Sequence, residues 1–190
     1  MFATKKKYYL IIQNTRDIKL TNIKLFNKFT IIYRNSGKKE NLTDLKRFRQ
    51  LCKRKRMQFF VANNVELTTK LKADGLYISS HNNDLKLARL KLANYKIIGS
   101  IHNIKELSIK KKQMCNSYLF SRLFKTDYSF KKDYLGVVKF NLISLSFGED
   151  LIALGGIRKS NINKLKIVNS KSVSLLSEVK KKPAIISRLF

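Results

Sequence analysis

The sequence predicts an α/β fold, a small single (β/α)8 TIM barrel, and three observations favour this class. Short apolar runs alternate with segments of helical pattern almost to the end of the 190 residues. Tight hairpins do not join these runs, so neighbouring strands are expected to be parallel. There are eight such runs, which favours a closed barrel over an open sheet. The barrel is lean, because such folds usually have about 200 residues or more.

The eight runs have the length of strands that are buried on both faces. In order they are Tyr8–Ile12, Phe29–Tyr33, Phe59–Ala62, Gly75–Ile78, Lys96–Gly99, Ser117–Phe120, Leu151–Leu154 and Ser172–Leu176. Pro183 interrupts the segment after Ser177, so the last helix of the barrel is expected to be reduced.

The segments between the runs carry helix signals. A basic amphipathic helix is expected to begin at Thr43-Asp44 and to bury one face, made of Leu45, Phe48, Leu51 and Cys52. A short helix over 64–71 is expected to bury Val65, Leu67 and Leu71. Another begins at Asp84 and carries Leu85, Leu87, Ala88, Leu90 and Leu92, and Asn103 caps a further helix. No linker divides the chain, so residues 1–190 are expected to form one domain.

The chain is strongly basic, with 41 Lys and Arg against 12 Asp and Glu and a net charge of +29. Such a charge favours a polyanionic partner, with nucleic acid as the first candidate. However, the lysines are spread along the chain in small clusters such as Lys110 to Lys112, and AT-rich coding DNA would give the same composition. No arginine-rich tail or aromatic RNA-binding signature accompanies them. Nucleic acid is therefore not expected as the main partner, and a phosphorylated small molecule would benefit from the same field.

Cysteine usage and the amino terminus bear on the compartment. Cys52 and Cys115 are far apart in periodic segments, which favours buried thiols in a reducing compartment over a disulfide or metal pair. The apolar run after Lys7 is shorter than a signal-peptide core, and no run reaches membrane-spanning length. A cytoplasmic protein with no membrane partner is expected.

The seventh run ends in a Gly155-Gly156 turn, and a helical stretch with polar start signals follows it. Paired glycines let the backbone approach a ligand, and the next helix points free N–H groups at it. In (β/α)8 barrels the turns after the seventh and eighth strands commonly hold phosphate. An ordinary tight turn can have the same residues, so the glycine pair indicates phosphate binding only in combination with other motifs.

Motifs at several strand ends follow one another in a fixed order. They are Arg34 after Ile32-Tyr33, Phe60-Val61-Ala62-Asn63-Asn64, Ala73-Asp74-Gly75-Leu76-Tyr77, Ile97-Ile98-Gly99-Ser100-Ile101-His102-Asn103, Phe120-Ser121-Arg122-Leu123-Phe124-Lys125-Thr126, and Ile152-Ala153-Leu154-Gly155-Gly156-Ile157 with Asn161. In this order and at nearly this spacing they resemble the thiamin phosphate synthase/TenI family of small (β/α)8 barrels. The resemblance extends from about Tyr8 to Ser177.

Synthases of this family join a pyrimidine pyrophosphate to a thiazole phosphate and release pyrophosphate. The resemblance implies catalytic roles for Arg34, Asn63 and Ser100. It also implies that the phosphate is bound by Thr126, Gly155, Gly156 and Ser177.

The chain departs from the family pattern at its charged positions. The family's two magnesium carboxylates fall on Asn64 and Asn82, which implies at most a weak Mg²⁺ site, because amides bind hard cations less tightly than carboxylates. The second-strand lysine falls on Ser36, with Lys38 and Lys39 close by, and Lys131 and Lys132 lie just beyond the altered sixth-strand motif. TenI-type proteins use a histidine at the position of Arg122, so that base is missing. His102 matches the fifth-strand turn, and His81 lies in a polar loop.

Three functions remain open. The first is a divergent thiamin phosphate synthase. The second, favoured by the missing carboxylates, is a catalytically degenerate barrel that binds thiazole or thiamin phosphates without turnover. The third is a basic RNA-associated protein, supported by charge alone. The sequence leaves the oligomeric state open.

Overall fold

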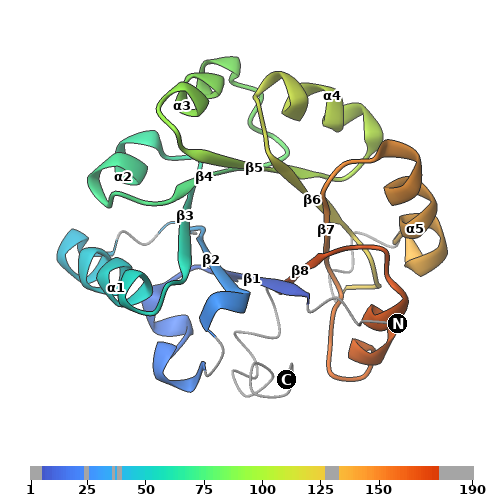
Figure 1. Cartoon of the computed structure of the whole chain (residues 1–190), viewed down its shortest axis with the longest axis horizontal. Coiled ribbons are helices and arrows are strands. Elements are labelled where there is room, and N and C mark those ends of the chain that lie inside the picture. The colour runs from blue at the N-terminus through green and yellow to red at the C-terminus, as the bar shows by residue number, and fades with distance from the viewer. Residues whose placement is uncertain (1–5, 24–25, 36, 38–39, 127–132, 176–190) are drawn as a thin grey trace.

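The computed structural model describes residues 6–23, 26–35, 37, 40–126 and 133–175, and these form a closed barrel of eight parallel strands (Figure 1). The strands are β1 (Lys7–Ile12), β2 (Phe29–Tyr33), β3 (Gln58–Ala62), β4 (Gly75–Ile78), β5 (Lys96–Ile101), β6 (Ser117–Ser121), β7 (Leu151–Leu154) and β8 (Ser172–Leu175). The predicted fold class is confirmed. The largest error in a strand boundary is at β5, which continues to Ile101 instead of ending at Gly99.

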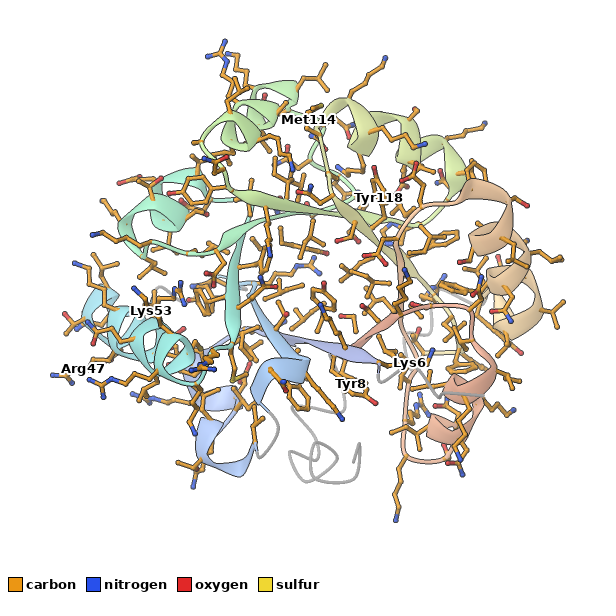
Figure 2. The ribbon with its side chains drawn as sticks, in the orientation of Figure 1. Lys6, Tyr8, Arg47, Lys53, Met114 and Tyr118 are labelled. Carbon is orange, nitrogen blue, oxygen red and sulfur yellow. The ribbon has the colours of Figure 1, made fainter. Side chains whose placement is uncertain are left out.

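β1 pairs with β8 as well as with β2, which closes the barrel. Lys6 adds to this closure, because its Nζ donates to the carbonyl oxygens of Val168 (2.9 Å) and Ser170 (2.5 Å) in the loop before β8 (Figure 2). The first and last strands are therefore tied by side chain as well as by backbone.

The helices outside the barrel are short. They are α1 (Leu42–Arg54), α2 (Val65–Lys70), α3 (Arg89–Leu92), α4 (Ile104–Lys112) and α5 (Gly136–Phe147). Within the ranges given above, the connections also contain five 3₁₀ segments, namely η1 (Thr15–Asp17), η2 (Leu20–Asn22), η3 (Phe26–Lys28), η4 (Leu85–Ala88) and η5 (Ile162–Ile167). In their described residues the β1–β2 and β7–β8 connections contain only such turns, which explains how the barrel fits a short chain. The predicted reduced helix after β8 lies outside the described residues.

Asparagine side chains start three of the helices. The Oδ1 atoms of Asn41, Asn64 and Asn103 accept from backbone N–H groups of the first turns of α1, α2 and α4. The predicted cap at Asn103 is confirmed. The predicted start of α1 at Thr43-Asp44 is wrong, because Asn41 makes the capping bond to Thr43 N (2.9 Å).

Several apolar positions of the predicted helices are exposed, and for Leu51 and Val65 this differs from the expected burial. Leu51 lies at the edge of the buried face of α1 and is 43% exposed, and Val65 at the start of α2 is 37% exposed. Leu85 and Leu92 are 52% and 87% exposed, because the segment changes from 3₁₀ to α geometry between them. A 3₁₀ turn has 3.0 residues instead of 3.6, so a stripe with helical spacing rotates away from the core.

The core has two parts, one inside the barrel and one between the strands and the helices. The interior is filled by alternate residues of the strands, which are Tyr9, Ile11, Ile32, Phe60, Tyr77, Ile98, Leu119 and Ile152. The outer part includes Cys52, which is fully buried, and Cys115 packs against it while partly exposed. Burial raises the pKa of both free thiols to about 12.

No helix in the described ranges is long and apolar enough to span a membrane. The assignment of residues 1–190 to one domain stays a prediction.

Candidate functional site at the barrel mouth

The carboxyl ends of all eight strands meet at one end of the barrel, here called the mouth. Arg34 follows β2, Asn63 follows β3, and Ser100 lies near the end of β5. The Gly155-Gly156 pair follows β7 on the other side of the ring. Most of the predicted site residues therefore share one end of the fold, where barrel enzymes carry their sites. Ser177, Ser36, Lys38, Lys39, Lys131 and Lys132 lie outside the described residues.

Asn63 is fixed at the corner between β3 and β4. Its Oδ1 accepts from Ser79 N (2.9 Å) and from Asn82 Nδ2 (3.3 Å), and its Nδ2 donates to Ser79 Oγ (3.0 Å). Its backbone has φ = 53°, a left-handed conformation that asparagine adopts more readily than most residues. Asn63 and Asn82 thus meet as a hydrogen-bonded amide pair.

The positions predicted to hold magnesium use their oxygens for other contacts. Asn64 Oδ1 accepts from Leu67 N (2.8 Å) as the cap of α2, and Asn82 Oδ1 accepts from Asp84 N (3.0 Å). Among the described residues, no group of three His, Cys, Asp or Glu side chains could hold a metal ion. Magnesium in proteins is usually held by one or two carboxylates. This donor set does not fit a resident magnesium ion.

Arg34, Tyr77 and Ser100 form a polar group near the barrel axis. Tyr77 is almost fully buried in the barrel interior, and its hydroxyl lies near the Ser100 side chain. Burial raises the pKa of Tyr77, while the Ser100 hydrogen bond and the positive charge of Arg34 lower it in part. Arg34 continues the β1–β2 ladder through its N–H to the carbonyl oxygen of Ile12 (2.8 Å), and its side chain is exposed.

The Gly155-Gly156 turn packs tightly against the loop after β6. A Cβ atom at Gly156 would lie 2.3 Å from the carbonyl oxygen of Phe124 and 2.5 Å from that of Lys125. The backbone has φ = 67° there, so only glycine fits without strain. Asn161 holds the turn, since its Nδ2 donates to the carbonyl oxygen of Gly156 (2.8 Å). The helical stretch that follows is the six-residue 3₁₀ segment η5 instead of an α-helix, so the turn itself must supply N–H donors.

Thr126 lies directly after this contact. Its Oγ1 is buried and has no hydrogen-bond partner among the described residues. Buried hydroxyls are nearly always paired, because leaving one unpaired costs about 1–3 kcal/mol. A ligand oxygen at this place would complete the missing hydrogen bond.

The two histidines of the chain lie close together at the mouth, which the sequence did not reveal. The ring centroids of His81 and His102 are 6.1 Å apart, and His102 Nδ1 lies 3.4 Å from Glu106 Oε2. The His102 N–H also donates to that oxygen (2.8 Å). At the position of the TenI-type base, Arg122 packs against Gly155, where an added Cβ would lie 3.1 Å from the Arg122 Cγ.

Two further residues were missed because a polar residue in or beside a run of lysines is usually exposed to solvent. Lys110 sits in a run of three lysines, yet both Lys110 and Gln113 are fully buried. The available signal was their spacing, since Lys110 and Gln113 follow the buried Leu107 at intervals of three residues.

Comparison with known proteins gives a consistent result. The family model described as "Thiamine monophosphate synthase" matches residues 9–179. A thiamine-phosphate synthase of Prochlorococcus marinus is 28% identical over 139 residues, which are 73% of this chain and 40% of that protein. The Clostridioides difficile thiamine-phosphate synthase is 23% identical over 177 residues, 93% of this chain and 81% of the relative. The chain thus spans less than half the length of the Prochlorococcus relative.

Among solved structures, thiamine phosphate pyrophosphorylase from Pyrococcus furiosus superposes with a TM-score of 0.70 at 18% identity. The match covers 99% of this chain and 98% of the other. A structure titled "Native KDPGal structure" gives a TM-score of 0.67 at 10% identity, with 99% and 96% covered. At these identities the superpositions show a shared barrel fold.

Proposed function

The chain belongs to the thiamine monophosphate synthase family, and from this premise we propose that it joins a pyrimidine pyrophosphate to a thiazole phosphate. The observations that support the proposal are the tight Gly155-Gly156 turn and, next to its contact with Phe124 and Lys125, the buried hydroxyl of Thr126, which has no hydrogen-bond partner within the described part of the chain. A phosphate oxygen would satisfy that hydroxyl, and the left-handed turn leaves its own N–H groups available for the same anion.

The reaction needs cations near the leaving group and little acid–base chemistry. The bond between the pyrimidine methylene carbon and the pyrophosphate oxygen breaks, and its electron pair leaves with pyrophosphate. The lone pair of the thiazole nitrogen then forms the new carbon–nitrogen bond. In this scheme Arg34 binds the pyrophosphate as a bidentate donor and stabilises its growing charge.

The remaining predicted residues position the two substrates. Asn63 and Ser100 orient the pyrimidine pyrophosphate, and Tyr77 lies beside Ser100. The thiazole phosphate is bound by Thr126, Gly155 and Gly156, and Ser177 is proposed to join them. Because the oxygens of Asn64 and Asn82 are committed to backbone donors, no step is assigned to a resident magnesium ion.

Turnover of the two substrates by purified protein tests the proposal. We expect wild type to form thiamin phosphate and Arg34→Ala to lose at least about 100-fold in rate, the scale seen when one preorganised charge-stabilising donor is removed. Arg47→Ala is the matched control, because Arg47 lies on the outer face of α1 (Figure 2). If Arg34→Ala and Arg47→Ala turn over alike, Arg34 has no catalytic role.

The side-chain oxygens of Asn64 and Asn82 accept hydrogen bonds from backbone N–H groups, which favours a second candidate function. This candidate is a barrel that binds the phosphates without turnover. In that case no product forms, but thiazole phosphate still raises the melting temperature by mass action. Thr126→Val should remove that stabilisation, because it replaces the hydroxyl proposed to bind the phosphate with a methyl group.

A further inference from the structure

Helix α4 and the residue after it carry two fully buried polar side chains on the outside of the barrel, Lys110 and Gln113. Lys110 Nζ donates to the carbonyl oxygen of Asn82 (2.6 Å) and to Gln113 Oε1 (3.0 Å). Gln113 Nε2 donates to the carbonyl oxygens of Asn82 (2.9 Å) and Asp84 (3.0 Å). We call this pair the Lys110–Gln113 clamp.

The strand beneath α4 leaves room for the clamp. A Cβ atom at Gly99 in β5 would lie 3.1 Å from Lys110 Cγ and 2.9 Å from Cys115 Sγ, so the lysine stem occupies the space that a side chain would need. Burying an ammonium group is costly unless it is well hydrogen-bonded, and apolar residues of similar size often give equal stability. Stability alone therefore does not explain a lysine at this place.

The loop between β4 and η4 connects the clamp to the mouth of the barrel. It holds the backbone of that loop at Asn82 and Asp84, and the Asn82 side chain in turn donates to Asn63 Oδ1 (3.3 Å). Ser79 N donates to the same oxygen (2.9 Å). The loop is thus held from outside the barrel by the clamp and contacts Asn63 on its inner side.

We propose that Lys110 and Gln113 are positioning residues that fix the Asn82 loop against Asn63, and so set the geometry of the pyrimidine pyrophosphate half of the site. This inference rests on the proposed function. A metal shared by two carboxylates would brace the turns after β3 and β4 directly. This chain has amides at those places, so the brace comes from the scaffold behind the loop.

The test compares Lys110→Met, which keeps most of the stem and removes the donors, with Lys112→Met. Lys112 is exposed on the same helix, so its variant removes the same charge without touching the clamp. The first readout is hydrogen exchange in the wild type and both variants. In Lys110→Met, the amides of Ser79, Asn82 and Asp84 are expected to exchange at least about tenfold faster, because their acceptors lie within the loop and the amide pair. Amides around Gly155 stay unchanged.

The second readout separates positioning from general damage. In Lys110→Met the KM for pyrimidine pyrophosphate is expected to rise about tenfold while the KM for thiazole phosphate stays within about twofold, since the clamp bears on one half of the mouth. An equal rise in both values, or unchanged exchange over 79–85 in a folded variant, overturns the proposal.

Two provisions keep the result decisive. If Lys110→Met does not fold, the double variant Lys110→Met/Gln113→Met replaces both side chains of the clamp by apolar groups and leaves neither of them half-paired. If wild type itself has no turnover, the proposed function fails, and the exchange rates over 79–85 still decide whether the clamp fixes the loop.

Discussion

The side chains of Asn64 and Asn82 differ from carboxylates by one functional group, and that difference changes what their turns can bind. Each amide oxygen accepts from one backbone N–H, and the Asn82 amide also donates to Asn63. A carboxylate at position 82 could not make that donation. The turns after β3 and β4 are therefore joined directly by the hydrogen bond from Asn82 to Asn63.

Restoring both acids should restore a metal site. In Asn64→Asp/Asn82→Asp, the carboxylate at position 82 faces Asn63 Oδ1, so we expect a lower melting temperature than wild type in chelator. Magnesium chloride should recover several degrees in the double variant, because only the native state holds the ion, and should leave wild type unchanged. Asn83→Asp, which adds an acid at an exposed position of the same loop, is the control. Equal magnesium responses in all three proteins would refute this explanation.

Gly156 is needed for both its backbone conformation and its lack of a side chain. Gly156→Ala is expected to cost more than about 3 kcal/mol of unfolding free energy, from the left-handed backbone and from the contacts with Phe124 and Lys125. Gly148→Ala isolates the backbone cost, because φ is 59° there and nothing lies within 4 Å, so about 1 kcal/mol is expected. Chemical denaturation of both variants provides the comparison, and equal losses would show that the predicted contact is absent.

Helix α5 shows where an element escaped sequence reasoning. Its apolar residues surround the helix, with Phe140 fully buried and Val138, Leu142 and Leu145 exposed, so no single stripe marks an inner face. The eight strands were predictable because each is a short apolar run buried on both faces. The segment 85–92 was predicted as part of one helix, but it is divided into the 3₁₀ segment η4 and the short helix α3.

The packing of α5 predicts unequal costs for truncation along it. Phe140→Ala should lower the free energy of unfolding by about 3–5 kcal/mol, because it leaves a cavity beside Phe120. Leu142→Ala, at a position that is 61% exposed, should change it by less than about 0.5 kcal/mol. Urea unfolding of both variants measures the difference. A large loss for Leu142→Ala would mean that this face is covered by something else in solution.

Across the whole molecule, the sequence predicted the barrel and the strand ends that make the mouth, but not how the mouth is held. Motif order placed Arg34, Asn63, Ser100 and Gly155 at one end of the fold, since parallel strands bring their carboxyl ends together. It could not show that the buried Lys110 contacts the Asn82 loop, because that contact joins residues 28 positions apart. It also could not show that His81 lies beside His102.

The buried thiol of Cys52 makes the free energy of unfolding decrease at alkaline pH. Burial raises its pKa from 9.0 to about 12, so between these values the unfolded chain loses a proton that the folded protein keeps. The contribution of this thiol to the unfolding free energy is therefore constant below about pH 9 and falls as the pH rises from there towards 12, by about 1.4 kcal/mol per pH unit. Unfolding free energies of wild type minus Cys52→Ala, measured at pH 8 and pH 10 under reducing conditions, isolate this effect from the many lysines. A difference that does not change with pH contradicts the burial of this thiol.

The central proposal is that this basic barrel is a synthase whose own residues bind the pyrophosphate of one substrate and the phosphate of the other. The most direct measurement is the rate of thiamin phosphate formation from pyrimidine pyrophosphate and thiazole phosphate by the purified chain, across a range of magnesium concentrations. We expect product from wild type and from Arg47→Ala, with the rate lost in Arg34→Ala. No product from wild type at any magnesium concentration would contradict the proposal.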